Sequence, residues 1–128
     1  GVALYVSFFL GMAPDAGWFA YTPLSNREYS PGLRMDVWAT MITFIELSAL
    51  VAAVELIVSI LKLRAPGMSI HRMPLFIWAI LVVSFMIVFA MPPVMVASLM
   101  LALDRTAGTH FFAVSNGGDP LLWQHLFW

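Results

Sequence analysis

The apolar positions of the chain fall into four runs, which predict helices or parts of helices. The runs cover residues 1–12, 35–63, 73–103 and 120–128. The second and third are longer than the roughly 20 residues that a helix needs to cross the apolar core of a bilayer. The first and last are too short to cross, so we expect them to be the end and the beginning of spanning helices. The pattern therefore predicts an all-α membrane protein.

Helix-terminating signals lie between and inside these runs. Asp36 near the start of the second run suits a helix N-terminus, and Pro66-Gly67 ends that helix. Asp119-Pro120 is typical of an N-cap followed by a proline in the first turn. Pro92-Pro93 lies inside the third run and predicts a kink, because proline withholds an N–H from the helix.

Composition makes lipid the solvent for much of this surface. Of the 128 residues, 62% are hydrophobic and only 10% are charged, whereas about a quarter of a soluble domain is charged. The absence of cysteine excludes disulfides and iron–sulfur clusters. The net charge of -1 gives no sign of a nucleic-acid partner. Since the chain begins and ends within apolar runs, we expect one partial transmembrane domain, 1–128, from inside a longer protein.

The charges of the loops predict the orientation in the membrane. Lys62, Arg64 and Arg72 lie between the second and third runs, whereas the other two loops mix acidic and basic residues. The positive-inside rule places the basic loop in the cytoplasm and the mixed loops outside. Aromatic residues gather at the outer edges, as they do in interface belts: Trp18, Tyr21, Tyr29, Trp38, Phe111, Phe112 and Trp123.

Two carboxylic acids lie deep in the second run, where an ionisable group is costly. Glu46 and Glu55 are nine residues apart and therefore face opposite sides of a helix. Glu55 shares its face with Ser48 and Ser59, which is compatible with a polar, proton-conducting track. The alternative is that each acid is protonated and hydrogen-bonded to a neighbouring helix. The sequence leaves both open for Glu55 and favours the second for Glu46.

The other candidate ligands indicate no metal site. His71, His110 and His125 are far apart in the sequence and form no helical ligand pair. The nine methionines are irregularly spaced and are read as packing residues.

The loops and helix ends resemble one known family. The motifs are GWFAYTPL at 17–24, ILKLRAPGM at 60–68, MPLFIW at 73–78, LDR at 103–105, THFF at 109–112 and GGDPLLWQHLFW at 117–128. In order and spacing they resemble subunit I of haem–copper terminal oxidases. The chain would correspond to the end of helix III, helices IV and V, and the start of helix VI of a twelve-helix transmembrane bundle.

This resemblance implies a respiratory enzyme. Such oxidases reduce O2 to water with electrons from cytochrome c and pump protons. The implied cofactors are haem a, haem a3 and copper B, whose ligands would lie outside this chain, so the fragment alone is expected to be inactive. The implied partners are oxidase subunits II and III, cytochrome c or quinol, and membrane lipid. The implied location is the bacterial plasma membrane, as a multi-pass protein.

Four residues take roles from the resemblance. Trp18 matches a tryptophan near the haem propionates, and Trp128 one that packs beside the copper site. Ser48 matches a serine of the D-type proton pathway on helix IV. Glu55 stands where many members have asparagine, and Ala49 where they have a second serine. We expect Glu55 to be hydrated and to face the pathway.

Two alternative functions remain. Quinol-oxidising members share APGM at 65–68 and THFF at 109–112, whereas GDPLLWQH at 118–125 resembles the cytochrome c branch more closely. A polytopic transporter, with Glu46 and Glu55 as coupling-ion groups, is the alternative from another class.

Overall fold

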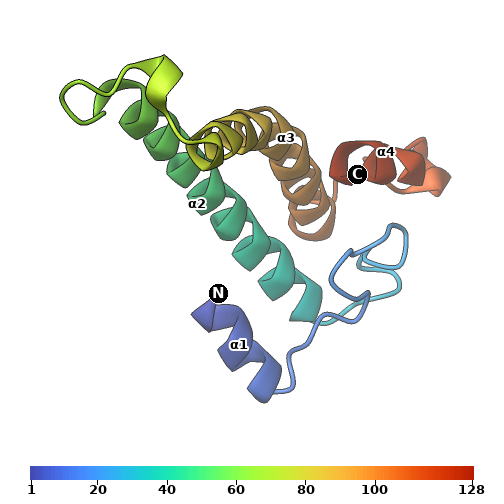
Figure 1. Cartoon of the computed structure of the whole chain (residues 1–128). Coiled ribbons are helices and arrows are strands. Elements are labelled where there is room, and N and C mark those ends of the chain that lie inside the picture. Colours follow the sequence, from blue (N-terminus) through green and yellow to red (C-terminus); the bar gives the residue numbers. More distant parts are fainter. The chain divides into compact units, whose positions relative to one another are not determined.

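The computed structural model describes residues 1–128 and contains only helices, turns and loops (Figure 1). The helices are α1 (Val2–Phe9), α2 (Arg34–Lys62), α3 (Leu75–Thr106) and α4 (Pro120–Phe127), with short 3-10 helices η1 (Ile70–Arg72) and η2 (Val114–Asn116). The prediction of an all-α chain is confirmed. By length and composition, α2 and α3 can each cross a membrane.

The helix ends differ from the predicted ones where polar residues or glycine intervene. Helix α1 ends at Phe9 rather than near residue 12, and Gly11 follows with a left-handed φ of 72°. Helix α3 continues to Thr106, beyond the predicted end at 103. It also continues without interruption through Pro92 and Pro93, and the kink there stays a prediction.

The chain forms two compact units, residues 1–45 with 93–128 and residues 46–92. The first unit has a small core around Trp123. Its buried residues are Ala20, Met35, Trp38, Ala39, Ala97, Leu101, Phe112 and Trp123. The indole N–H of Trp123 donates to the Phe19 carbonyl at 3.1 Å, which satisfies the only polar group of the side chain.

This core corrects the expected aromatic belt. Trp38, Phe112 and Trp123 are buried rather than facing an interface. Phe112 meets Trp123 edge to face, with ring centroids 5.7 Å apart. The belt interpretation was wrong for these three because loop segments fold over them, which the position of a residue along an apolar run does not reveal.

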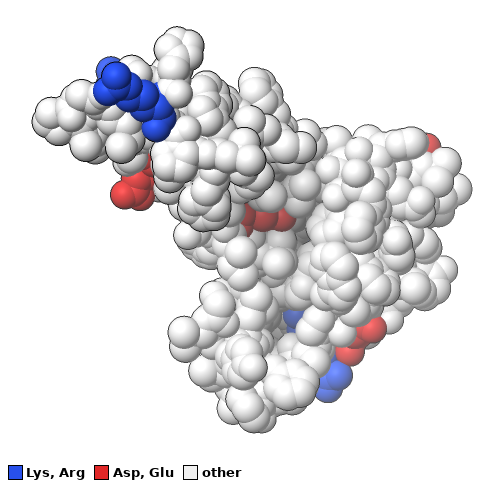
Figure 2. Space-filling model, viewed as in Figure 1, with Lys and Arg blue, Asp and Glu red and all other residues white.

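The second unit consists of the C-terminal part of α2, the connecting loop with η1, and the N-terminal part of α3. The loop turns at Gly67, whose φ is 81°, and the Met68 N–H donates to the Ala65 carbonyl at 3.0 Å. Figure 2 shows a group of basic side chains over this loop. Lys62, the last residue of α2, and Arg72, the last residue of η1, are both exposed.

Candidate functional site

The most strongly connected side chain of the first unit is Arg105, in the last turn of α3. It is 2% exposed, and its guanidinium holds the Asp36 carboxylate through two bonds, Nε–Oδ1 at 2.7 Å and Nη2–Oδ2 at 3.1 Å. The same guanidinium donates to the carbonyls of Ser25 at 2.7 Å and Gly32 at 2.8 Å. Arg105 therefore ties the end of α3 to the start of α2 and to the loop before it.

The neighbouring acid, Asp104, organises the loop that follows α3. Its Oδ1 accepts from the Thr109 hydroxyl at 2.6 Å and from the Phe111 N–H at 2.9 Å. Its Oδ2 accepts from the Phe112 N–H at 3.0 Å. Three donors on one carboxylate hold the backbone so that the Phe112 ring enters the core.

The start of α4 is attached to the same end of the unit. Asp119 caps α4 by accepting from the Leu121 N–H at 2.8 Å, which confirms the predicted N-cap. The Thr22 hydroxyl donates to the Pro120 carbonyl at 3.2 Å. The Gly118 N–H donates to the Ala113 carbonyl at 2.9 Å. The loop before α2 and the start of α4 are thereby joined by a hydrogen bond.

Trp18 and Trp128, expected from the resemblance to lie near the haem and copper, are brought together. Their rings meet edge to face with centroids 5.8 Å apart. Both remain exposed, at 62% and 66%. Phe127 contacts both rings, with centroids 6.2 Å from Trp18 and 5.5 Å from Trp128. The three form an aromatic cluster.

The acids of α2 differ in burial, as their opposite faces predict. Glu46 is 6% exposed, whereas Glu55 and Ser48 are exposed. Ser59 is half-buried. The Ser48–Glu55 face of α2 therefore presents polar groups outward, and the roles of Ser48 and Glu55 stay predictions.

The Arg105–Asp36 pair was not predicted from the sequence, because Asp36 was interpreted as a helix-start charge and Arg105 as a loop residue. One signal could have revealed it. Oppositely charged residues at the start of one spanning helix and at the end of the next become neighbours when a short loop joins the two helices.

None of the described residues form a group of three or more His, Asp or Glu side chains able to hold a metal ion. His71, His110 and His125 are all exposed and lie in separate elements.

Comparison with known proteins gives one family over the whole chain. Residues 1–128 match the family model described as "Cytochrome C and Quinol oxidase polypeptide I". The cytochrome c oxidase subunit 1 of Bacillus subtilis (strain 168) is 42% identical over 128 residues, which is 100% of this chain and 20% of that protein. The quinol oxidase subunit 1 of the same organism is 40% identical over 123 residues, 96% of this chain and 19% of that protein.

A third relative has a different organisation. The heme-copper oxidase subunit I+III of Aeropyrum pernix is 43% identical over 129 residues, which covers 100% of this chain and 16% of that protein. The chain thus spans about a fifth of the length of these curated relatives.

Proposed function

We propose that this chain, which belongs to the family of cytochrome c and quinol oxidase polypeptide I, is part of subunit I of a respiratory terminal oxidase. The whole protein would reduce O2 to water with electrons from cytochrome c and couple this to proton pumping. The observation that carries the proposal is the family match over all 128 residues. Membership and the two long apolar helices confirm an integral membrane protein, and the bacterial relatives agree with a plasma-membrane location.

The chemistry of the whole protein would depend on groups held outside this chain. Haem a, haem a3 and copper B would supply the electron transfer and the site of O2 reduction. Since the described residues include no ligand cluster, the remainder of the protein would hold these groups. What this chain contributes is a scaffold: two spanning helices, and an outer end held together by Arg105, Asp36 and Asp104.

A quinol-oxidising enzyme is the second candidate, because a quinol oxidase subunit is 40% identical to this chain. We favour cytochrome c because GDPLLWQH at 118–125 resembles that branch more closely. A copper-binding subunit II encoded beside this gene would support cytochrome c as the donor. A subunit II that lacks the copper site would support quinol.

The function is tested on the full-length protein in its complex. Purified from the membrane, it is expected to show a haem spectrum and to consume O2 when supplied with reduced cytochrome c. Consumption with a quinol but not with cytochrome c would transfer the proposal to the second candidate. A protein without haem would overturn the oxidase proposal and favour the transporter alternative.

We assign the Trp18–Trp128 cluster a place beside the cofactors, because its exposed ring faces suit packing against a large planar group. The test is a Trp18→Phe variant of the full-length protein, with Leu24→Ala, an exposed residue of the neighbouring loop, as a control. We expect the haem spectrum or potential to shift in the first variant only. Identical spectra in both variants would argue against this placement.

We place Glu55 and Ser48 on a hydrated proton path, because both are exposed on α2 and lie seven residues apart, on one helical face. In the full-length enzyme, Glu55→Gln is expected to lower the number of protons pumped per electron while O2 reduction continues. Glu46→Gln, on the buried side of the same helix, is the matched control. Unchanged pumping in Glu55→Gln would remove Glu55 from the path.

A further inference from the structure

We propose that the loop between α2 and α3, with the apolar surface of α3 that follows it, binds an anionic phospholipid of the adjacent leaflet. The headgroup would lie against the basic residues of the loop, and one acyl chain would lie along α3. This inference uses only the membrane location of the chain and does not depend on the oxidase activity.

The first observation is a net positive charge. Lys62, Arg64 and Arg72 lie in or next to the loop, and the nearest acid in the sequence is Glu55, so residues 55–103 contain three bases and one acid. The two ion pairs of the chain, Arg34–Asp15 and Arg105–Asp36, belong to the first unit. The only side-chain hydrogen bond among the three basic residues runs from Arg64 to the Ile60 carbonyl, at 3.3 Å. Figure 2 shows basic side chains together over this loop.

The second observation is that large apolar side chains surround these charges. Leu63, Leu75 and Phe76 are 75%, 85% and 71% exposed. A soluble anion such as a nucleotide would gain nothing from them. A phospholipid presents an anion and a hydrocarbon chain at the same boundary, so it matches both features at once.

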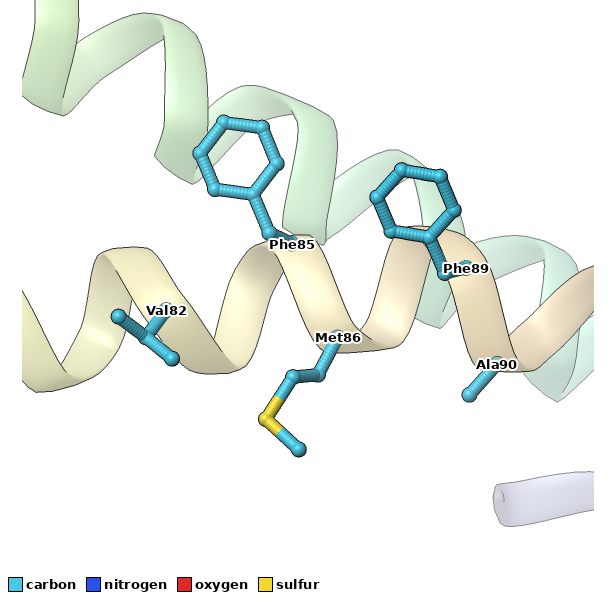
Figure 3. A pocket seen from close by; sticks show the side chains of 5 residues that line it. All are labelled: Val82, Phe85, Met86, Phe89 and Ala90. Carbon is cyan, nitrogen blue, oxygen red and sulfur yellow. The ribbon is translucent and has the colours of Figure 1, made fainter.

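The third observation is an open apolar strip further along the same helix. The strip is formed by Val82, Phe85, Met86, Phe89 and Ala90 (Figure 3). Val82, Met86 and Ala90 are spaced by four residues and therefore follow one side of α3. All five side chains are apolar and come from the second unit, as the basic loop does.

The first part of this strip lies within the depth of one leaflet. At 1.5 Å per residue, the strip begins about 10 Å from Leu75 and ends about 22 Å from it. Half of the hydrocarbon core of a bilayer is about 15 Å thick. A lipid whose headgroup contacts Arg72 would therefore place the end of its acyl chain at the level of Met86.

The test measures lipid binding to the full-length protein in its complex by native mass spectrometry. Dioleoylphosphatidylglycerol is compared with dioleoylphosphatidylcholine, which has the same acyl chains but no net charge. We expect the anionic lipid to bind more tightly. In the triple variant Lys62→Gln/Arg64→Gln/Arg72→Gln its affinity is expected to fall by about fivefold for each charge removed, or about 100-fold in all.

Three further variants separate the contributions. Arg64→Lys/Arg72→Lys keeps the charges and is expected to retain most of the binding. Arg34→Gln removes an exposed charge from the first unit and is expected to leave binding unchanged. Met86→Trp obstructs the strip at the level where the dioleoyl chain would end and is expected to weaken the dioleoyl lipid more than a dilauroyl lipid, whose chains are shorter. Size-exclusion chromatography and helical circular dichroism check that each variant is folded.

Several outcomes would overturn the proposal. Equal affinity for the two lipids, or unchanged binding of phosphatidylglycerol in the folded triple variant, would remove the basic loop as a headgroup site. Competition by inorganic phosphate as effective as that by the lipid would show that the hydrocarbon chain contributes nothing. Loss of another subunit from the triple variant, with lipid binding intact, would assign the loop to a protein partner.

Discussion

Replacing Arg105 by methionine is expected to release the end of α3 from α2 and from the loop before it. Methionine keeps most of the volume of the arginine stem but removes all four hydrogen bonds, to the Asp36 carboxylate and to the carbonyls of Ser25 and Gly32. Removing one partner of a buried ion pair costs about 3–5 kcal/mol. The Asp36 side chain is 29% exposed and can regain some water, so we expect a loss of about 3 kcal/mol.

The effect is measured by hydrogen exchange of the full-length protein in detergent, at loop amides that are hydrogen-bonded in the folded state. The N–H groups of Ser25 and Ser30 donate to the carbonyls of Tyr21 and Asn26, at 3.0 and 2.9 Å. A loss of about 3 kcal/mol would accelerate their exchange by more than 100-fold if opening the clamp is what exposes them. The thermal midpoint of the whole protein should fall as well.

Arg34→Met is the matched control, because Arg34 also pairs with an aspartate in the same unit. That pair has a single contact of 3.1 Å, and its side chains are 52% and 37% exposed. Exposed pairs contribute about 0–1 kcal/mol. A second comparison adds Asp36→Leu to Arg105→Met, which removes the unpaired carboxylate and should recover at least half of the loss. If Arg105→Met accelerates exchange no more than Arg34→Met does, the clamp does not hold the loop.

Three further substitutions test the loops of the outer end by the same thermal and exchange measurements. Gly118→Ala is expected to lower the stability by about 1–3 kcal/mol, because the new Cβ would collide with the His110 carbonyl and lie 2.7 Å from two more backbone atoms. Gly32→Ala is the control and should leave the stability unchanged, because no atom lies within 4 Å of a Cβ there. Asp104→Asn should cost about 2 kcal/mol, since the carboxylate accepts three bonds; an effect no larger than that of the exposed Glu28→Gln would contradict this. Trp123→Phe should cost about 1–2 kcal/mol through the lost bond to the Phe19 carbonyl and lost volume, and no change in melting would refute it.

The spanning helices could be predicted closely because a continuous apolar run is a local property of the sequence. Residues 35–63 and 73–103 were expected, and the helices run from Arg34 to Lys62 and from Leu75 to Thr106. The start of α4 was also correct, because an aspartate before a proline satisfies a free N–H by itself. Each of these signals acts within a few residues of the element it forms.

The last turn of α3 could not be predicted from the local sequence. The apolar run stops at Leu103, and a charged pair follows, so the pattern predicts a loop. The helix continues because Arg105 finds four acceptors in segments that lie 69 to 80 residues away in the sequence. Hydropathy scores each position by its own side chain, whereas the cost of burying a charge depends on the partner that meets it.

The balance of acidic and basic residues differs between the two ends of helices α2 and α3. At the end with Arg105, the sequence contains acids as well as bases, and the structure pairs the most buried base with an acid of the neighbouring helix. At the other end, Lys62, Arg64 and Arg72 outnumber Glu55, the nearest acid in the sequence, and none of the three forms an ion pair. Positive charges at a membrane surface without a partner in the protein are attracted to anionic lipid. A basic residue at a helix end is therefore interpreted by counting the acidic residues near the same helix end. Equal numbers of acids and bases indicate an internal ion pair, as at Arg105. An excess of bases indicates a surface that binds an anionic partner such as lipid.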